Sequence, residues 1–118
     1  MAYENLQGIL PALMTAFTDD GARIDPARIR NLVRHLIDSG VHGLYVGGSS
    51  GEMLLCSTEE RMELLEIVLD VTKNADRPVS VIAHVGSTGT RETLALARHA
   101  AASGADAVSS VTPLYFAY

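Results

Sequence analysis

Apolar and polar positions form alternating blocks along the chain, and the first blocks predict a strand followed by a helix. Residues 8–17 are apolar without a helical period and lead into the turn sequence Asp19-Asp20-Gly21, which indicates a buried strand from Gly8 to Phe17. Asp25 and Pro26 then supply an N-cap and a proline at the first helical position. The next apolar residues share the spacing of one helix face: Ile29, Leu32, Val33, Leu36 and Ile37. Gly40 suits the left-handed residue at which such a helix ends.

The same alternation continues to the end of the chain. Three short apolar runs predict further strands: Gly43 to Val46, Val79 to Ala83 and Ala107 to Val111. Ser57 and Glu60 have the spacing of a capping box, which predicts a helix that runs through Lys73. An alanine-rich helix is predicted to follow Thr90 and to end at Ser103. The order of elements is therefore βαβαβαβ.

A weak internal repeat supports parallel strands. Ser39 to Val46 resembles Ser103 to Ser110, which begins 64 positions later, so each βα unit takes about 32 residues. Continuous apolar strands between amphipathic helices indicate a parallel sheet with covered faces. Eight such units would take roughly 260 residues, the size of a TIM barrel. We therefore expect residues 1–118 to form one partial α/β domain, the N-terminal half of a parallel (β/α)8 barrel with strands one to four and helices one to three.

An open doubly wound sheet would use the same alternation of elements. Its dinucleotide fingerprint places glycines directly after the first strand. That position reads Thr15-Ala16-Phe17-Thr18-Asp19 and contains none, which favours the barrel.

Charge and cysteine content narrow the class of protein. The net charge is −5 and no basic run occurs, so a nucleic-acid partner is not expected. The first eight residues lack the pattern of a signal peptide, and every apolar run is shorter than a membrane helix needs. The single cysteine, Cys56, fits a reducing compartment, and a cytoplasmic location is expected.

The loops that follow the strands are where ligands bind in either architecture. The most informative is Gly47-Gly48-Ser49-Ser50-Gly51-Glu52, where glycines allow close backbone approach and two serines add hydroxyl groups. Successive N–H groups in such a turn can bind an anion, so a carboxylate or a phosphate is the expected ligand. The alternative is a glycine-rich loop that only makes a tight turn.

The segment Gly43-Leu44-Tyr45-Val46-Gly47-Gly48-Ser49-Ser50-Gly51-Glu52 resembles the signature of the N-acetylneuraminate lyase and dihydrodipicolinate synthase family. Segments that begin at Asn5, Ile82 and Asp106 are similar to other parts of that family, so the resemblance runs along the whole chain. It implies a TIM barrel and a tetrameric class I aldolase that forms a Schiff base with pyruvate. The paired glycines and the sequence Val111-Thr112-Pro113-Leu114-Tyr115 are more similar to the neuraminate lyase branch.

The resemblance also implies roles for individual residues. Gly48, Ser49 and Ser50 match positions that hold the pyruvate carboxylate, and the Ser49 hydroxyl matches a member of a proton relay. Tyr115 matches a tyrosine that enters the neighbouring subunit's site to complete that relay. Ala16 stands where the family usually has proline, and Ser50 replaces a commoner threonine.

A Schiff-base enzyme needs a desolvated lysine at the end of a strand. The only lysine, Lys73, is predicted at the end of a helix in the outer ring of the barrel, where it cannot serve. In the family, that lysine and a further tyrosine come from later strands. We therefore expect the chain to be an enzyme fragment that is inactive by itself.

Other polar residues have both a chemical and a structural interpretation. His84 could be a base or a metal ligand, but no second ligand stands at metal spacing, so a packed histidine is preferred and no metal or other cofactor is expected. For Glu52, a carboxylate that accepts N–H bonds in its own loop is preferred over a general base. Cys56 is interpreted as an inert thiol, and Thr15 as structural or as a support for residues that contact the ligand.

The leading hypothesis is thus a fragment of a pyruvate-dependent aldolase or lyase, with a small 2-oxo acid as substrate and a homo-oligomeric assembly. Two alternatives stay open. One is a dihydrodipicolinate synthase, which condenses pyruvate with aspartate semialdehyde. The other is a non-catalytic module that keeps the anion-binding loop and associates through its sheet edges.

Overall fold

The structure is a computed structural model and describes residues 4–112. Its α-helices are α1 (Pro26–Asp38), α2 (Thr58–Lys73) and α3 (Thr90–Ser103). Its strands are β1 (Gly43–Val46), β2 (Ser80–His84) and β3 (Ala107–Ser109), and two short 3-10 helices, η1 (Ser49–Gly51) and η2 (Met53–Leu55), follow β1. Strands and helices therefore alternate along the chain, as the pattern of apolar residues predicts.

The three strands form one parallel sheet in the order β1-β2-β3. In the register, Tyr45 pairs with Ile82, which in turn pairs with Ala107. Successive side chains of a strand point to opposite faces. Leu44, Val46, Val81 and Ala83 therefore share one face, and all four belong to the buried core.

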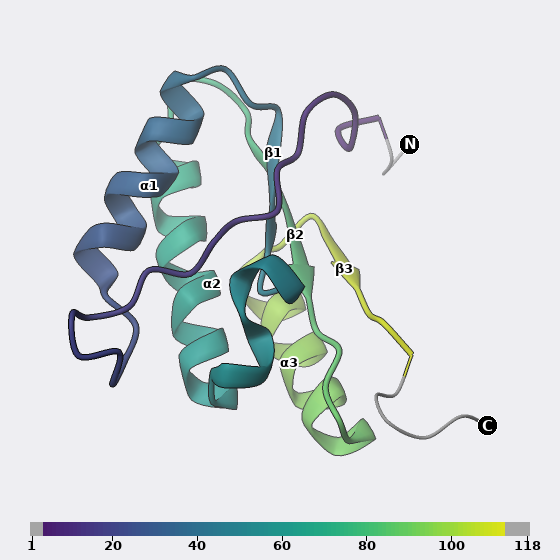
Figure 1. Cartoon of the computed structure of the whole chain (residues 1–118). Coiled ribbons are helices and arrows are strands. Elements are labelled where there is room, and N and C mark those ends of the chain that lie inside the picture. Colours follow the sequence, from purple (N-terminus) through teal and green to yellow (C-terminus); the bar gives the residue numbers. More distant parts are fainter. Residues whose placement is uncertain (1–3, 113–118) are drawn as a thin grey trace.

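All three helices cover that same face of the sheet, α2 lying between the other two (Figure 1). The core combines the strand residues with one apolar stripe from each helix: Ile29 and Val33 of α1, Leu64, Leu65 and Val68 of α2, and Leu96 and Ala100 of α3. A doubly wound sheet carries helices on both faces, whereas a barrel carries them only on its outside. Helices on a single face, with strands in sequential order, identify the winding of a TIM barrel.

The helix ends confirm the capping predicted from sequence. The Asp25 side chain accepts a hydrogen bond from the backbone N–H of Arg28 at the start of α1. Ser57 and Glu60 form the reciprocal bonds of a capping box at the start of α2. Beyond the carboxyl ends of α1 and α3, Gly40 and Gly104 have φ of +93° and +90°. Only glycine adopts this region without strain, which explains the abrupt ends.

The strand predicted from Gly8 to Phe17 is wrong as a continuous element, although the segment lies where a strand would. It runs parallel to β1, where the backbone N–H of Leu13 donates to the Tyr45 carbonyl at 2.8 Å and the N–H of Tyr45 donates to the Pro11 carbonyl at 3.0 Å. Two residues earlier, the N–H of Gly43 reaches the carbonyl of Ile9 at 3.3 Å. The next bond of a parallel ladder would need an N–H at Pro11, which proline lacks. A single bridge, Ala12 with Tyr45, remains.

The other strands form close to their predicted bounds. β2 begins and ends one residue later than the apolar run Val79 to Ala83, and β3 ends at Ser109, two residues before the predicted end. In residues 4–112, no helix combines the length and the apolar character that crossing a membrane requires.

Candidate functional site

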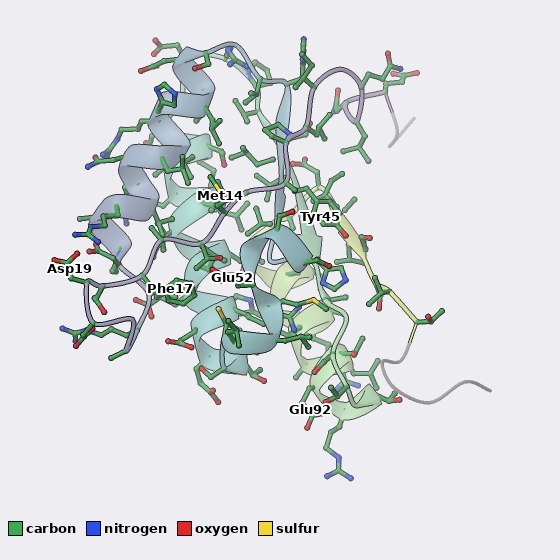
Figure 2. All side chains as sticks on the ribbon, in the orientation of Figure 1. Met14, Phe17, Asp19, Tyr45, Glu52 and Glu92 are labelled. Atoms are coloured by element: carbon green, nitrogen blue, oxygen red, sulfur yellow. The ribbon has the colours of Figure 1, made fainter. Side chains whose placement is uncertain are left out.

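The loops after the strands meet at one edge of the sheet because the strands are parallel. Residues 47–52 follow β1, residues 85–89 follow β2, and residues 110–112 follow β3. Figure 2 labels Tyr45 on β1 and Glu52 between η1 and η2, which locates this edge. Ligands of parallel α/β proteins bind at such an edge.

The turn after β1 presents two serines to solvent. Gly47 begins it with φ +75°, a backbone conformation that favours glycine. The N–H of Gly51 donates to the Gly48 carbonyl and the N–H of Glu52 to the Ser49 carbonyl, both at 3.0 Å, which closes η1. Ser49 and Ser50 are exposed on this turn. Within the described part of the chain, their backbone N–H groups have no acceptor, so two N–H groups and two hydroxyls are available to an anion.

Neighbouring residues fix this turn from below. A Cβ atom on Gly48 would lie 2.6 Å from Cε1 of the Tyr45 ring, so the ring packs directly against the Gly48 backbone. The buried Thr15 hydroxyl donates to the carbonyl of Gly51 at 2.6 Å, as expected of a structural residue. A Cβ atom on Gly51 would lie 3.1 Å from the Leu13 carbonyl. The glycines therefore allow the turn to pack against both β1 and the N-terminal segment.

Tyr45 also connects β1 with β3 across the face of the sheet that carries no helix. Its hydroxyl donates to Oγ of Ser109 at 3.0 Å. No role was predicted for this pair from the sequence, although the internal repeat already relates the two residues. Tyr45 and Ser109 occupy the same position in the two repeated segments, so both side chains point to the same face.

His84, at the end of β2, is a packed and hydrogen-bonded histidine, as preferred from the sequence. His84 is only 5% exposed. Nδ1 lies 3.1 Å from the Gly47 carbonyl oxygen, and Nε2 lies 3.3 Å from the backbone nitrogen of Val111. Burial, followed by the positive charge of Arg61, lowers the pKa of His84, and the hydrogen bond to Gly47 opposes this shift. The imidazole is therefore neutral at pH 7.

Arg61 of α2 is a buried cation beside the site, and no role was predicted for it from the sequence. Its guanidinium donates to the Gly86 carbonyl at 2.8 Å and to the His84 carbonyl at 2.9 Å. Burial lowers the pKa of Arg61, but a guanidinium stays charged at neutral pH. The available signal was its place on the apolar stripe of α2, three residues before Leu64 and seven before Val68.

The structural role expected of Glu52 is wrong. Its side chain makes no capping hydrogen bond to η2, and the residue is exposed. Its contribution is a left-handed backbone, with φ +57° and ψ +41°. No other non-glycine residue in the described range 4–112 has a positive φ. This conformation ends η1 and begins η2 at a modest cost in strain.

Lys73 lies away from this edge of the sheet, whereas Cys56 follows η2 in the loop that leads to α2. Lys73 is exposed in the last turn of α2, and its ammonium donates to the Ser103 carbonyl at 3.1 Å. That helix end precedes the amino end of β2, opposite to the Gly47 turn. The Cys56 thiol is partly buried, and burial raises its pKa, which agrees with an inert thiol.

Tyr115 lies outside the described residues, so its expected role stays a prediction. Within residues 4–112, no group of three His, Cys, Asp or Glu side chains could hold a metal ion. The site therefore combines exposed serines and backbone N–H groups left unpaired by the described chain on one turn, which Thr15, Tyr45 and His84 hold in place.

Residues 5–118 match a known protein family, described as the dihydrodipicolinate synthetase family. A curated relative, the N-acetylneuraminate lyase of Citrobacter koseri, is 45% identical over 115 residues. This match covers 98% of the chain and 37% of the relative. The chain thus spans little more than a third of the length of the curated relatives it matches.

Solved structures agree with this comparison. A sialic acid aldolase from Ruminococcus gnavus superposes with a TM-score of 0.90 at 37% identity, over 98% of this chain and 37% of that one. A mutant of its catalytic lysine has also been solved. An Escherichia coli prophage protein of the dihydrodipicolinic acid synthase family, in complex with pyruvate, gives a TM-score of 0.83 at 38% identity, over 92% of this chain and 35% of that one.

Proposed function

Because the chain belongs to the dihydrodipicolinate synthetase family, we propose that it supplies the pyruvate-binding turn of a class I aldolase similar to N-acetylneuraminate lyase. Such an enzyme cleaves a 2-oxo acid to pyruvate and an aldehyde, or runs the reverse condensation. The lyase branch is favoured because the Ruminococcus gnavus sialic acid aldolase superposes over more of the chain and with a higher TM-score than the prophage protein.

The geometry of the Gly47–Glu52 turn carries this proposal. Pyruvate presents a carboxylate next to a ketone. The N–H groups of Ser49 and Ser50 are not used by the described chain, and both hydroxyls are exposed beside them. Hydrogen bonds to a carboxylate are charge-assisted and therefore stronger than neutral ones. Gly48, Ser49 and Ser50 are thus assigned to the pyruvate carboxylate.

The Ser49 hydroxyl has a second assignment as a member of a proton relay. When an amine adds to the ketone of pyruvate, the resulting carbinolamine must lose its oxygen as water. Protons must therefore reach that oxygen from a positioned donor. We assign this transfer to Ser49 together with Tyr115 of a neighbouring subunit, in a homotetramer that we place in the cytoplasm.

The amine itself must come from a lysine other than Lys73. The Lys73 ammonium is exposed and bonds to a helix-end carbonyl, so it lacks the desolvation that makes a lysine nucleophilic. The catalytic lysine named for the Ruminococcus gnavus enzyme provides a precedent.

Borohydride trapping tests this proposal. The complete gene product is incubated with pyruvate and borohydride, which reduces an imine to a stable secondary amine, and is then weighed and peptide-mapped. We expect a mass gain on a lysine other than Lys73, unchanged in the matched variant Lys73→Arg and reduced in Ser50→Ala. No mass gain, or a gain on Lys73, would overturn the proposal. Pyruvate binding without a mass gain would favour the non-catalytic module.

Mixed oligomers test the shared relay. Ser49→Ala and Tyr115→Phe variants are each expected to lose most of their turnover. Subunits of the two variants are then unfolded together and reassembled. If Tyr115 acts in the neighbouring site, some sites regain both an intact serine and an intact tyrosine, and activity returns. Activity that stays at the level of the separate variants would contradict the assignment.

A further inference from the structure

The two ring nitrogens of His84 face opposite kinds of partner. Nδ1 lies 3.1 Å from the Gly47 carbonyl oxygen, which can only accept a hydrogen bond. Nε2 lies 3.3 Å from the backbone nitrogen of Val111, which can only donate. Both contacts are satisfied only when Nδ1 carries the proton and Nε2 does not. The hydrogen bonds therefore define one neutral tautomer of His84.

Arg61 does not change this assignment. One of its terminal nitrogens lies 3.4 Å from Nδ1, but the same nitrogen donates to the His84 carbonyl at the shorter distance of 2.9 Å. A doubly protonated ring would direct a second N–H at the N–H of Val111 and would add a charge beside the guanidinium. The neutral form protonated on Nδ1 satisfies both Gly47 and Val111, while the Arg61 nitrogen keeps its shorter bond to the His84 carbonyl.

Two other histidines make different hydrogen bonds and serve as internal references. His42 accepts a hydrogen bond from the N–H of Ile9 at Nδ1, over 3.0 Å, so its neutral form carries the proton on Nε2. Nε2 of His99 lies 2.7 Å from a carboxylate oxygen of Glu66 and must donate to it. Among these three residues, His84 alone needs its proton on Nδ1.

We propose that His84 is a positioning residue that ties the anion-binding turn after β1 to the segment after β3 through this tautomer. The bond to Gly47 fixes the residue that begins the turn bearing Ser49 and Ser50. The bond from Val111 fixes the strand end that leads, four residues later, to Tyr115. The consequences for catalysis rest on the function proposed above, whereas the tautomer itself does not.

The surroundings of His84 allow little other adjustment. The Tyr45 ring lies 6.1 Å from the imidazole, centroid to centroid, and also packs against Gly48. Arg61 holds the His84 carbonyl from the helix layer. A Cβ atom on Gly86 would lie 2.8 Å from the imidazole, so the next loop is also in close contact with it. The ring therefore has a fixed orientation, and its two hydrogen bonds act on two different loops.

Two substitutions separate these hydrogen bonds. His84→Asn places an amide near the position of Nδ1 and can still donate to Gly47, but it leaves Val111 without its acceptor. His84→Gln reaches toward the position of Nε2 and can accept from Val111, but it releases Gly47. We expect His84→Gln to raise the half-saturating pyruvate concentration about tenfold, with turnover within about twofold, because one hydrogen bond to the binding turn is lost. His84→Asn is expected to show the reverse, with turnover about tenfold lower.

Imidazole nitrogen shifts test the tautomer without any activity. The complete gene product is labelled with 15N-histidine, and two-bond ring correlations at pH 7.5 assign each nitrogen as protonated or bare. We expect a protonated Nδ1 and a bare Nε2 for His84, whereas His99 should carry a proton on Nε2. A His84 protonated on Nε2 would overturn the proposal, as would Asn and Gln variants that change binding and turnover equally. If the wild type forms no Schiff base, the proposed function fails, and the nitrogen shifts alone then decide the tautomer.

Discussion

Gly48→Ala is the most direct test of how the binding turn is supported. The backbone of Gly48 has φ −86° and ψ −164°, which alanine adopts without strain, so the substitution acts only through its added methyl group. That Cβ would lie 2.6 Å from Cε1 and 3.2 Å from Cδ1 of Tyr45. Carbon atoms pack best at about 3.5–4.0 Å, so one group must move by roughly 1 Å.

The Tyr45 ring is the less mobile of the two groups. It belongs to β1 and is held at its far end by the hydrogen bond from its hydroxyl to Ser109. The turn should therefore move outward and carry Ser49 and Ser50 with it. Overpacking of this kind costs about 1–3 kcal/mol. We expect a loss of stability in this range, together with weaker pyruvate binding, in urea denaturation and borohydride trapping of the complete gene product.

Two further variants make this prediction refutable. Gly21→Ala has φ +70° and no atom within 4 Å of the new Cβ, so it strains the backbone without a clash and should leave pyruvate binding unchanged. Tyr45→Leu removes Cε1, so Gly48→Ala should cost at least about 1 kcal/mol less in that background. Strictly additive effects of Tyr45→Leu and Gly48→Ala would refute the proposed packing.

Three further predictions concern stability and association. Thr15→Val leaves the buried Gly51 carbonyl without its donor and should lower the free energy of unfolding, measured in urea, by about 1–3 kcal/mol. The control Thr18→Val removes a surface bond to Asp20 and should lower it by less than about 0.5 kcal/mol. Burial keeps the pKa of folded His84 below its ordinary 6.5, so the unfolded state binds more protons than the folded state on acidification. The free energy of unfolding should therefore fall as the pH drops from about 7 to 5, and it should fall less steeply in His84→Asn. In the described range, β3 pairs only with β2, and Val108 on β3 is 51% exposed. A polypeptide of these 118 residues alone should therefore sediment as dimers or larger species at low micromolar concentration. A compact monomer would contradict this prediction.

The sequence predicted the helices well because their signals are local. The apolar stripe of α1, the capping box of α2 and Gly104 after α3 each depend on residues within a few positions of one another. The N-terminal strand was predicted too long, because an apolar run indicates burial and not which N–H groups can pair. Pro11 breaks the ladder there while the segment stays in place beside β1.

The residues that hold the turn in place were harder to predict from the sequence than the turn itself. The turn is visible in one run of glycines and serines, whereas its supports come from residues distant in the chain. Thr15 reaches Gly51 across 36 positions, and Arg61 reaches His84 across 23. Tyr45 and Ser109 could have been paired from the repeat, but only with the direction of each side chain in view.

The positive charge of Arg61 acts on both the turn after β1 and the His84 imidazole. A buried guanidinium with no carboxylate among its described hydrogen-bond partners keeps a net positive charge, which favours an anion at the nearby turn. Burial is the main cause that lowers the pKa of His84, and the same charge lowers it further because it opposes a second proton on the ring. If His84 were charged, Nε2 would present an N–H to the N–H of Val111, and the connection between the two loops would break. One cation in the helix layer thus favours the carboxylate proposed to bind at the turn and also preserves the neutral imidazole that holds the turn in position.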